Sequence, residues 1–172
     1  APDRHVHLLK QIEKKLLWLS AWTIHNANHI RPNRDGLKVG GHQASCASSI
    51  SILTALYMQI ARPQDRIAVK PHAGPVFHAI NHLFGRQSIE QMEGLRRMGG
   101  AQSYPSRTKD GPEVDFSTGS VGLGVAITSF SALIADYVRL HGLGRGELPP
   151  GRHIAIAGDA ERDEGNIYEA LL

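Results

Sequence analysis

Residues 153–165 read His-Ile-Ala-Ile-Ala-Gly-Asp-Ala-Glu-Arg-Asp-Glu-Gly, an apolar run followed by a glycine and an acidic turn. A short apolar run that ends at a glycine is typical of a buried strand. A second short apolar run, residues 66–69, precedes the loop 71–75, and helix-like patterns fill the chain between the two runs. Strands separated by helices predict an α/β fold with a parallel sheet flanked by helices.

Apolar residues recur at helical spacing in several stretches. We expect helices at about 6–28, 44–61, 75–84, 88–98 and 121–141, and a further helix that begins near residue 167. Ser88 is a suitable N-cap for the fourth of them. Residues 99–119 are rich in Gly, Ser, Pro and Thr and predict a long loop, and long ordered loops are commonly functional.

The chain has 172 residues, of which 41% are hydrophobic and 20% charged, with a net charge of +3. This composition predicts one globular domain rather than a disordered chain. The basic residues are scattered, so nucleic acid is not an expected partner, and a mild positive balance suits phosphorylated or carboxylate ligands. No apolar run approaches the roughly 20 residues that cross a bilayer, so no membrane is expected either.

The single cysteine, Cys46, cannot form a disulfide within the chain, which fits a reducing compartment and a cytoplasmic location. We expect it to be a small buried residue. Residues 167–172 begin a helix that has neither a C-terminal glycine nor a basic last turn. We therefore expect one domain, residues 1–172, that is cut short at its C-terminus and has a helical N-terminal segment at about 6–30.

Asp159 directly follows the expected strand and precedes an acidic turn. A carboxylate in that place can hold a hard cation such as Mg²⁺, which prefers oxygen ligands and can in turn hold a diphosphate. Gly158 would let the backbone approach such a ligand closely. An acidic loop without any metal explains the same residues, because Gly-Asp after a strand is common in α/β proteins.

Residues 119–124 form a glycine loop at the start of a helix, a place that favours anions. The spacing G-x-x-G-x-G differs from the dinucleotide fingerprint, so a nicotinamide cofactor is not expected. Close helix packing is the alternative reason for these glycines. His42 and His72 lie in loops, where they can donate to phosphate or move protons, or are simply solvated.

Two His-x-x-x-His pairs, His25 with His29 and His78 with His82, bear on a zinc site. A zinc hydrolase motif requires a glutamate after the first histidine, and this chain has Asn26 and Ala79 there. Packing or surface roles are the expectation for both pairs.

The motifs also follow one another in a particular order. They are Gly40-Gly41-His42-Gln43-Ala44-Ser45, Pro71-His72-Ala73-Gly74-Pro75, Ser103-Tyr104-Pro105, Ser117-Thr118-Gly119-Ser120-Val121-Gly122-Leu123-Gly124 and Gly158-Asp159-Ala160-Glu161-Arg162-Asp163-Glu164. The ordered set resembles the N-terminal, diphosphate-binding domain of the thiamine-diphosphate (ThDP) dependent transketolase superfamily, over nearly all of residues 10–172. Within that superfamily the resemblance is nearest to the homodimeric type of the pyruvate dehydrogenase first component, through residues 18–49 and Ser103-Tyr104-Pro105.

The resemblance implies a role for each matching residue. Asp159 would be a Mg²⁺ ligand, and Glu164 would belong to an acidic network that links the two active sites of a dimer. The residues implied to line the channel to the thiazolium are His42, His72 and Tyr104. Those implied to contact the cofactor are Gly119, Ser120, Val121 and Gly122 at the aminopyrimidine, and Gly158, Ala160 and Glu161 at the diphosphate.

One residue departs from the family pattern, which reads Gly-Asp-Gly where this chain has Gly158-Asp159-Ala160. If the backbone needs a positive φ at Ala160, the methyl group would cost about 1 kcal/mol or more. Diphosphate binding would then be looser than the motif suggests.

The resemblance implies an enzyme that decarboxylates a 2-oxo acid, which we expect to be pyruvate, and passes the two-carbon unit to a lipoyl-bearing acyltransferase of a multienzyme complex. It also implies a homodimer. A further Mg²⁺ ligand and the glutamate that activates the aminopyrimidine would lie outside this chain, so we expect the chain alone to be inactive. Two alternatives stay open: a transketolase that moves ketol units between sugar phosphates, and an inactive fragment or split-enzyme subunit that needs a partner chain.

Overall fold

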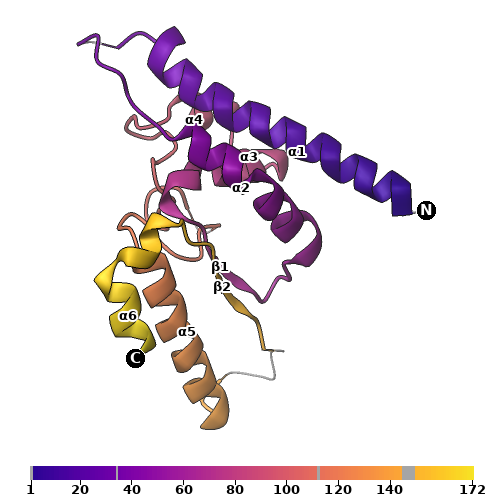
Figure 1. Cartoon of the computed structure of the whole chain (residues 1–172), viewed down its shortest axis with the longest axis vertical. Helices are drawn as coiled ribbons and strands as arrows, with labels where there is room; N and C mark the ends of the chain where they lie inside the picture. The colour runs from indigo at the N-terminus through magenta and orange to yellow at the C-terminus, as the bar shows by residue number, and fades with distance from the viewer. Residues whose placement is uncertain (1, 34, 112, 145–149) are drawn as a thin grey trace.

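The computed structural model describes residues 2–33, 35–111, 113–144 and 150–172. The helices and strands are α1 (Pro2–His25), α2 (Gln43–Ala55), β1 (Arg66–Ala68), α3 (Gly74–Leu83), α4 (Ile89–Glu93), α5 (Leu123–Leu140), β2 (His153–Ala155) and α6 (Gly165–Leu171). Figure 1 shows the two strands between a helical layer of α1 to α4 and the pair formed by α5 and α6. The α/β class with a parallel sheet flanked by helices is confirmed.

The sheet consists of β1 and β2, which run parallel with Arg66 opposite His153 and Ala68 opposite Ala155. The N–H of Arg66 donates to the carbonyl of Arg152 at 2.8 Å, and the N–H of Ile156 donates to the carbonyl of Ala68 at 2.8 Å. β1 is buried after its first residue, whereas all of β2 is only half-buried. The prediction of a buried second strand was therefore wrong in degree, because within the described chain β2 has a neighbour on one side alone.

α1 is a long amphipathic helix that packs against α2 and α3. Its core-facing residues Leu16 and Leu19 are 0% and 3% exposed, while Trp18 on the other side is 58% exposed. The helix continues into a π-helical turn, Asn26–Ile30. α2 continues in the same way into the π-helical turn Leu56–Ile60. The expected helices at 6–28 and 44–61 are confirmed in place, each with its last turn widened.

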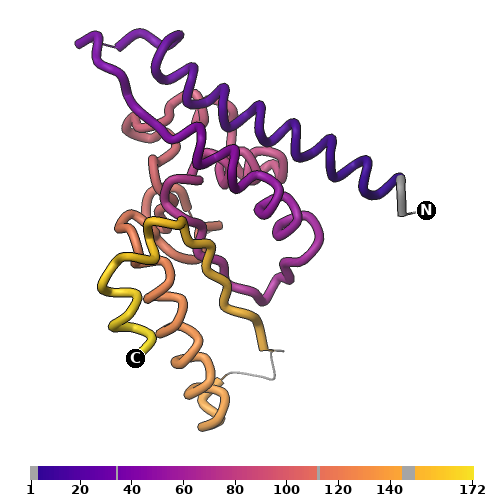
Figure 2. The backbone as a smooth tube through the Cα atoms, in the orientation of Figure 1, coloured from indigo at the N-terminus to yellow at the C-terminus, as the bar shows by residue number. Residues whose placement is uncertain are grey.

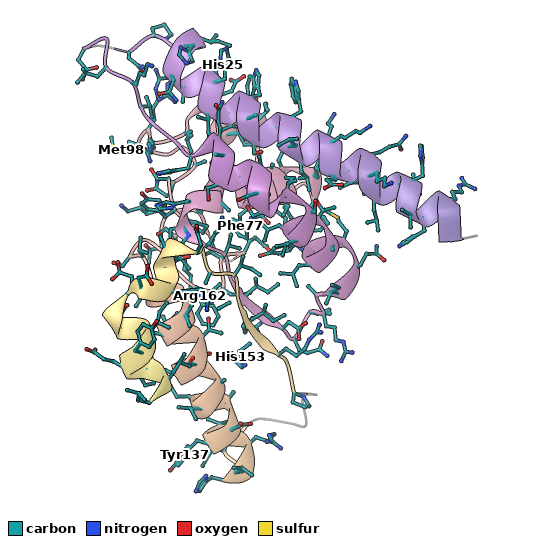
Figure 3. All side chains as sticks on the ribbon, viewed as in Figure 1. His25, Phe77, Met98, Tyr137, His153 and Arg162 are labelled. Atoms are coloured by element: carbon teal, nitrogen blue, oxygen red, sulfur yellow. The ribbon has the colours of Figure 1, made fainter. Side chains whose placement is uncertain are left out.

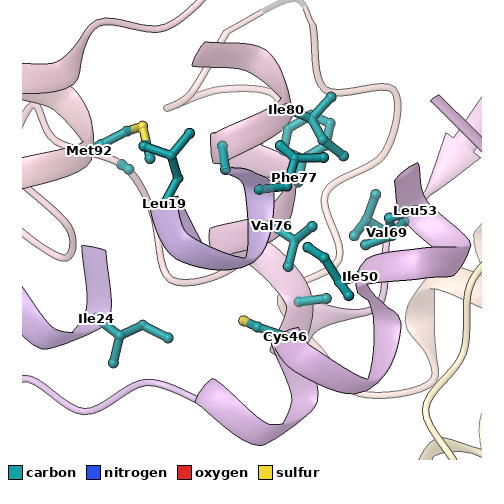
Figure 4. Close-up of a cluster of buried hydrophobic side chains, with 14 of the residues drawn as sticks. Leu19, Ile24, Cys46, Ile50, Leu53, Val69, Val76, Phe77, Ile80 and Met92 are labelled. Atoms are coloured by element: carbon teal, nitrogen blue, oxygen red, sulfur yellow. The ribbon is translucent and has the colours of Figure 1, made fainter. Parts of the chain in front are cut away.

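The hydrophobic core lies where α1, α2 and α3 meet the start of the sheet (Figure 4). Leu53 and Ile80 are completely buried there, as is Met92 from α4. Cys46 is 1% exposed, and burial raises the pKa of its thiol to about 11. The prediction of a small buried cysteine is confirmed, and the raised pKa makes its thiolate scarce near neutral pH.

α4 is shorter than the predicted helix 88–98. Ser88 caps it as expected: its hydroxyl accepts the N–H of Gln91 at 3.2 Å, and the Gln91 side chain accepts the N–H of Ser88 at 2.9 Å. The helix stops because the chain folds back on itself at Gly94 and Gly100. An added Cβ on Gly100 would lie 1.9 Å from the Gly94 carbonyl, so only a glycine permits this return.

α5 and α6 lie side by side at the C-terminal end of the chain (Figure 2). The buried side of α5 carries Gly124, Ala126 and Thr128, which face the sheet and α6. Its outer side leaves large apolar residues exposed: Phe130, Leu133, Ile134, Tyr137 and Leu140. Among the helices that the structure describes, α5 is the one that is long and apolar enough to cross a membrane, judged by length and composition. Its contacts with both strands and α6 make it part of this fold.

Candidate cofactor site

Two predicted site residues lie beyond the same edge of the sheet. Since β1 and β2 are parallel and Ala68 is opposite Ala155, the chain leaves both strands in the same direction. His72 comes four residues after Ala68, and Asp159 comes four residues after Ala155. Ligands of parallel sheets bind beyond this carboxyl edge. The structure thus confirms that His72 and Asp159 both follow the carboxyl edge of the sheet, as expected.

Glu161 holds the acidic turn against the glycine loop. Its side chain is buried, at 5% exposure, and accepts the N–H of Gly158 at 2.6 Å and the N–H of Gly122 at 3.1 Å. In Figure 3 the turn that carries Arg162 crosses the N-terminal end of α5. A carboxylate at a helix N-terminus is stabilised by the unpaired N–H groups and the helix dipole. The resemblance implied only backbone contact by Glu161, so this side-chain role was missed.

Gly122 is the point where the loop turns into α5. It is buried and has φ 83°, and an added Cβ would lie 2.6 Å from Asn166 Oδ1 and 2.9 Å from Glu164 Cβ. Close packing therefore requires this glycine. Gly119 and Ser120 are exposed, with open space around Gly119. Close packing therefore explains Gly122, whereas an anion-binding role for the exposed backbone of Gly119 and Ser120 stays a prediction.

Asp159 is exposed, and its carboxylate has no hydrogen-bond or ion-pair partner within the described ranges. It precedes a 3₁₀ turn, Ala160–Asp163, and its carbonyl accepts the N–H of Arg162 at 3.2 Å. Ala160 does not have a positive φ, because Arg96 is the one non-glycine residue with that conformation in the described chain. The strain considered for Ala160 is therefore absent.

His42, His72 and Tyr104 form an aromatic cluster. The rings of His42 and His72 stack with centroids 4.1 Å apart, and the ring of Tyr104 lies 6.1 Å from that of His72. His42 immediately precedes α2, and His72 lies in the 3₁₀ turn Pro71–Ala73. Burial, followed by the charges of His72 and Arg96, lowers the pKa of His42. The structure thus brings together three residues from separate loops that the sequence predicted to share a channel.

Close backbone packing places Tyr104 in this cluster. An added Cβ on Gly74 would lie 2.5 Å from the carbonyl oxygen of Ser103, so the loop that carries Tyr104 rests directly on the start of α3. Arg96 also lies near the cluster, because its guanidinium donates to the carbonyl of Val39, next to Gly40. No signal in the sequence placed Arg96 near His42.

The two His-x-x-x-His pairs differ in their surroundings. His78 is completely buried, with Nδ1 3.0 Å from Gln87 Oε1 and Nε2 2.8 Å from the Gln102 carbonyl. His82 Nδ1 lies 2.9 Å from the Gln87 carbonyl. His25 and His29 face each other at 4.9 Å between ring centroids. Packing is thus the observed role of the second pair.

The residues beyond the sheet edge fit a diphosphate held through a metal ion. Asp159 offers a free carboxylate, and Gly119 and Ser120 offer exposed backbone. Two buried oxygens have no hydrogen-bond partner: Asn166 Oδ1 beside Gly122, and the Oγ1 of Thr118, whose side chain lies beside Gly124. Buried polar atoms normally have partners, so orphaned ones indicate a place where a ligand or water belongs. No group of three or more His, Cys, Asp or Glu side chains that could hold a metal ion occurs in the part of the chain that the structure describes, so Asp159 would supply one ligand of several.

Fold and site together define an α/β domain whose acidic turn and glycine loop meet at the carboxyl edge of a parallel sheet. Comparison with known proteins agrees with the order of the motifs. No protein-family model matches the chain. The chain is 30% identical over 158 residues to the pyruvate dehydrogenase E1 component of Mycobacterium tuberculosis (strain ATCC 25618 / H37Rv). It is 33% identical over 132 residues to 1-deoxy-D-xylulose-5-phosphate synthase of Thiobacillus denitrificans (strain ATCC 25259 / T1). It is 29% identical over 161 residues to a 6-deoxy-6-sulfo-D-fructose transketolase subunit of Clostridium sp. (strain MSTE9).

These matches cover 86%, 77% and 86% of this chain, respectively. They cover 16%, 19% and 55% of the three relatives, so the chain spans only part of each. All three names fall within the superfamily that the motifs indicated. Over most of its length the chain is therefore similar to members of the thiamine-diphosphate-dependent transketolase superfamily.

Proposed function

We propose that this chain provides the diphosphate-binding part of a ThDP- and Mg²⁺-dependent enzyme that cleaves a bond next to a carbonyl group. The observation that carries the proposal is the Glu161 bridge, which holds the Asp159 turn against the 119–122 backbone. Two segments that the resemblance assigns to opposite ends of one cofactor are thereby fixed side by side. Similarity to members of the superfamily supports the same cofactor.

Each part of the site has a distinct task in this proposal. Asp159 would ligate Mg²⁺, and the backbone of Gly158 and Ala160 would approach the diphosphate. The exposed Gly119–Ser120 backbone would face the aminopyrimidine. ThDP supplies the carbanion chemistry when bound, and the protein positions it. The lowered pKa of His42 favours its neutral imidazole, which would accept a proton or hydrogen bond from the reacting carbonyl compound.

A 2-oxo acid, with pyruvate first, is the leading substrate candidate. Its support is the similarity to pyruvate dehydrogenase E1 components, including that of Escherichia coli (strain K12), where the match covers 97% of this chain at 28% identity. The acceptor would then be the lipoyl group of an acyltransferase in a multienzyme complex, and a cytoplasmic location belongs to the same proposal.

Ketol transfer between sugars is the second candidate, and one comparison favours it. The Clostridium relative is named as a transketolase subunit, and this chain spans 55% of its length, more than of the pyruvate dehydrogenase components. A subunit by that name needs a partner chain. The split-enzyme alternative therefore has the same support.

Assembly into a homodimer is also part of the proposal. The outer side of α5 exposes Leu133 and Ile134 at 63% each and Leu140 at 73%. Its two charged residues, Asp136 and Arg139, pair with each other at 2.9 Å and so leave the apolar stripe uninterrupted. An apolar stripe at helical spacing is suited to packing against another helix. A second copy would cover it, and sedimentation over a range of concentrations would test this.

Titration calorimetry with ThDP and Mg²⁺ tests the cofactor assignment on the chain itself. We expect binding that is weak, because the chain spans only part of the length of its relatives, and that disappears with EDTA or in Asp159→Asn. The matched control is Glu169→Gln, an exposed carboxylate on α6 that should leave binding unchanged. Binding that is indifferent to EDTA and to Asp159→Asn would contradict the metal role of Asp159. Tight binding by the chain alone would contradict the incomplete site.

A further inference from the structure

Asn28 lies in the widened turn at the end of α1 and contacts the segment that leads into His42. The π-helical turn Asn26–Ile30 follows α1, and Asn28 is at its centre and half-buried. In Figure 2 the chain leaves this turn, forms a loop and comes back toward α1 before it enters α2. Turns of this kind next to α-helices are frequent at functional sites. The function proposed above gives Asn28 no role.

The side chain of Asn28 binds both backbone groups of Gly40. Its Oδ1 accepts the N–H of Gly40 at 2.8 Å, and its Nδ2 donates to the carbonyl of Gly40 at 3.0 Å. The same Nδ2 donates to the carbonyl of Ile24, one turn earlier, at 2.7 Å. An ionised aspartate, which only accepts hydrogen bonds, could not make this set. The amide thus takes the place of a backbone partner for Gly40, two residues before His42.

The two glycines before His42 allow the backbone to come close to its neighbours. An added Cβ on Gly41 would lie 2.8 Å from Ile24 Cγ2, and one on Gly40 would lie 2.8 Å from Arg96 Nη1. Gly40 has φ 85° and Gly41 has φ 133°, conformations that favour glycine. The backbone therefore rests against α1 and against Arg96, and these contacts set the direction in which the chain reaches His42.

His42 is held through its backbone on both sides. Its carbonyl accepts the N–H of Cys46 at 3.0 Å, which fixes it to the first turn of α2. On the other side the chain is fixed at Gly40 by Asn28. The side chain of His42 makes no capping bond to α2, and its ring stacks on that of His72 at 4.1 Å. The stacked geometry therefore depends on where the backbone presents the ring.

We propose that Asn28 is a positioning residue for His42: it binds the backbone of Gly40 and thereby holds the ring of His42 against that of His72. Asn28 acts through Gly40 and not on the reacting compound. The inference rests on the proposed function for what His42 does in the reaction, whereas the placement of His42 rests on the contacts alone.

NMR of the isotope-labelled chain without ThDP or Mg²⁺ tests the proposal at His42 itself. In Asn28→Ala we expect the pKa of His42 to rise toward the ordinary histidine value of about 6.5. Burial and the charges of His72 and Arg96 lower this pKa, and they act fully only while the ring is held in place. An asparagine that only stabilises the fold would lower the unfolding temperature and leave the pKa of His42 unchanged in the folded variant.

Asn33→Ala is the matched control. Asn33 lies in the same loop, but its Nδ2 donates to the carbonyls of Ala27 and Leu37 and not to the glycines before His42. Its replacement removes a similar number of hydrogen bonds and should leave the pKa of His42 unchanged. An equal rise of this pKa in both variants, or no rise in Asn28→Ala, would overturn the proposal.

Amide hydrogen exchange tests the same contact in the natural chain, and so decides the question even if Asn28→Ala does not fold. The N–H of Gly40 should exchange at least about 10-fold more slowly than that of Gly41, relative to their intrinsic rates. The reason is that the N–H of Gly41 has no partner among the residues that the structure describes. An unprotected Gly40 N–H would overturn the proposal. Because no cofactor is present, failure here leaves the calorimetric test of ThDP binding untouched, and failure there leaves the role of Asn28 untouched.

Discussion

Glu161 accepts the backbone N–H of Gly122 at 3.1 Å, across 39 residues of sequence. The same carboxylate accepts the N–H of Gly158 at 2.6 Å. The turn after β2 and the loop before α5 are thus joined by one buried side chain. This bridge sets the position of Asp159 relative to the loop. The sheet edge that is proposed to bind the cofactor therefore depends on Glu161, whose carboxylate accepts backbone N–H groups.

Replacing Glu161 with glutamine should loosen this bridge. The amide of Glu161→Gln keeps one acceptor but puts an NH₂ group against a backbone N–H, and a hydrogen bond to a charged group is lost. We expect the free energy of unfolding to fall by about 1.5–3 kcal/mol. Urea unfolding followed by circular dichroism measures it. Glu169→Gln on the exposed face of α6 should change it by less than about 0.5 kcal/mol.

The two glycines of the loop should respond differently to a methyl group. Gly122→Ala introduces a Cβ at φ 83° and at 2.6 Å from Asn166 Oδ1, so we expect a loss of about 1–3 kcal/mol from conformational strain and overpacking together. Gly119→Ala meets nothing within 4 Å and should be nearly neutral. Thermal unfolding of both variants measures the difference, and equal effects would show that the loop is not packed as described.

Sequence periodicity located most elements of the fold because α1, α3 and α5 are amphipathic and bounded by turn residues. Periodicity did not predict the end of α4, which tertiary packing determines. The pattern at 88–98 predicted one helix, but the contact of Gly94 with Gly100 ends α4 at Glu93. A contact between two glycines cannot be recognised from the spacing of hydrophobic residues.

The same distinction holds for the site. His42, His72 and Tyr104 were predicted to share a channel because the ordered motifs resemble a family, and the structure brings their rings together. Their catalytic roles stay predictions. Glu161 was predicted as a cofactor contact through its backbone, but its side-chain role was missed because it acts through a hydrogen bond across 39 residues of sequence. Arg96 was not recognised as a site residue, because it reaches the cluster through a backbone turn with a positive φ.

The pair of Asp65 and Arg152 should give the domain an acid-sensitive stability. Hydrogen bonds from the Arg152 side chain hold the pKa of the buried Asp65 carboxyl well below its ordinary value, with further help from the N–H groups of Arg152 and Arg62. The folded state thus binds this proton less readily than the unfolded state. The stability from Asp65 is complete above the unfolded pKa of about 4 and is lost as pH falls toward the folded pKa.

Unfolding free energies measured between pH 7 and pH 2 should therefore decline below about pH 5 in the natural chain and decline less steeply in Asp65→Asn. That variant should also be less stable at pH 7, because the amide cannot accept all of the hydrogen bonds that the carboxylate does. Asp136→Asn is the control, since Asp136 and Arg139 are both more than half exposed. A parallel acid profile for Asp65→Asn would show that the decline has another source.

His42 should titrate below an ordinary histidine, and its neighbours should account for part of the shift. Burial lowers its pKa first, followed by the charges of His72 and Arg96. We expect a ¹H–¹³C NMR titration of the imidazole to place the pKa of His42 below about 6.5, and His72→Gln or Arg96→Gln to raise it. His141→Gln, at the far end of α5, should leave it unchanged. A pKa of His42 that does not move when His72 is replaced would mean that the stacked rings do not interact electrostatically, and the contribution of His72 to the lowered pKa of His42 would be disproved.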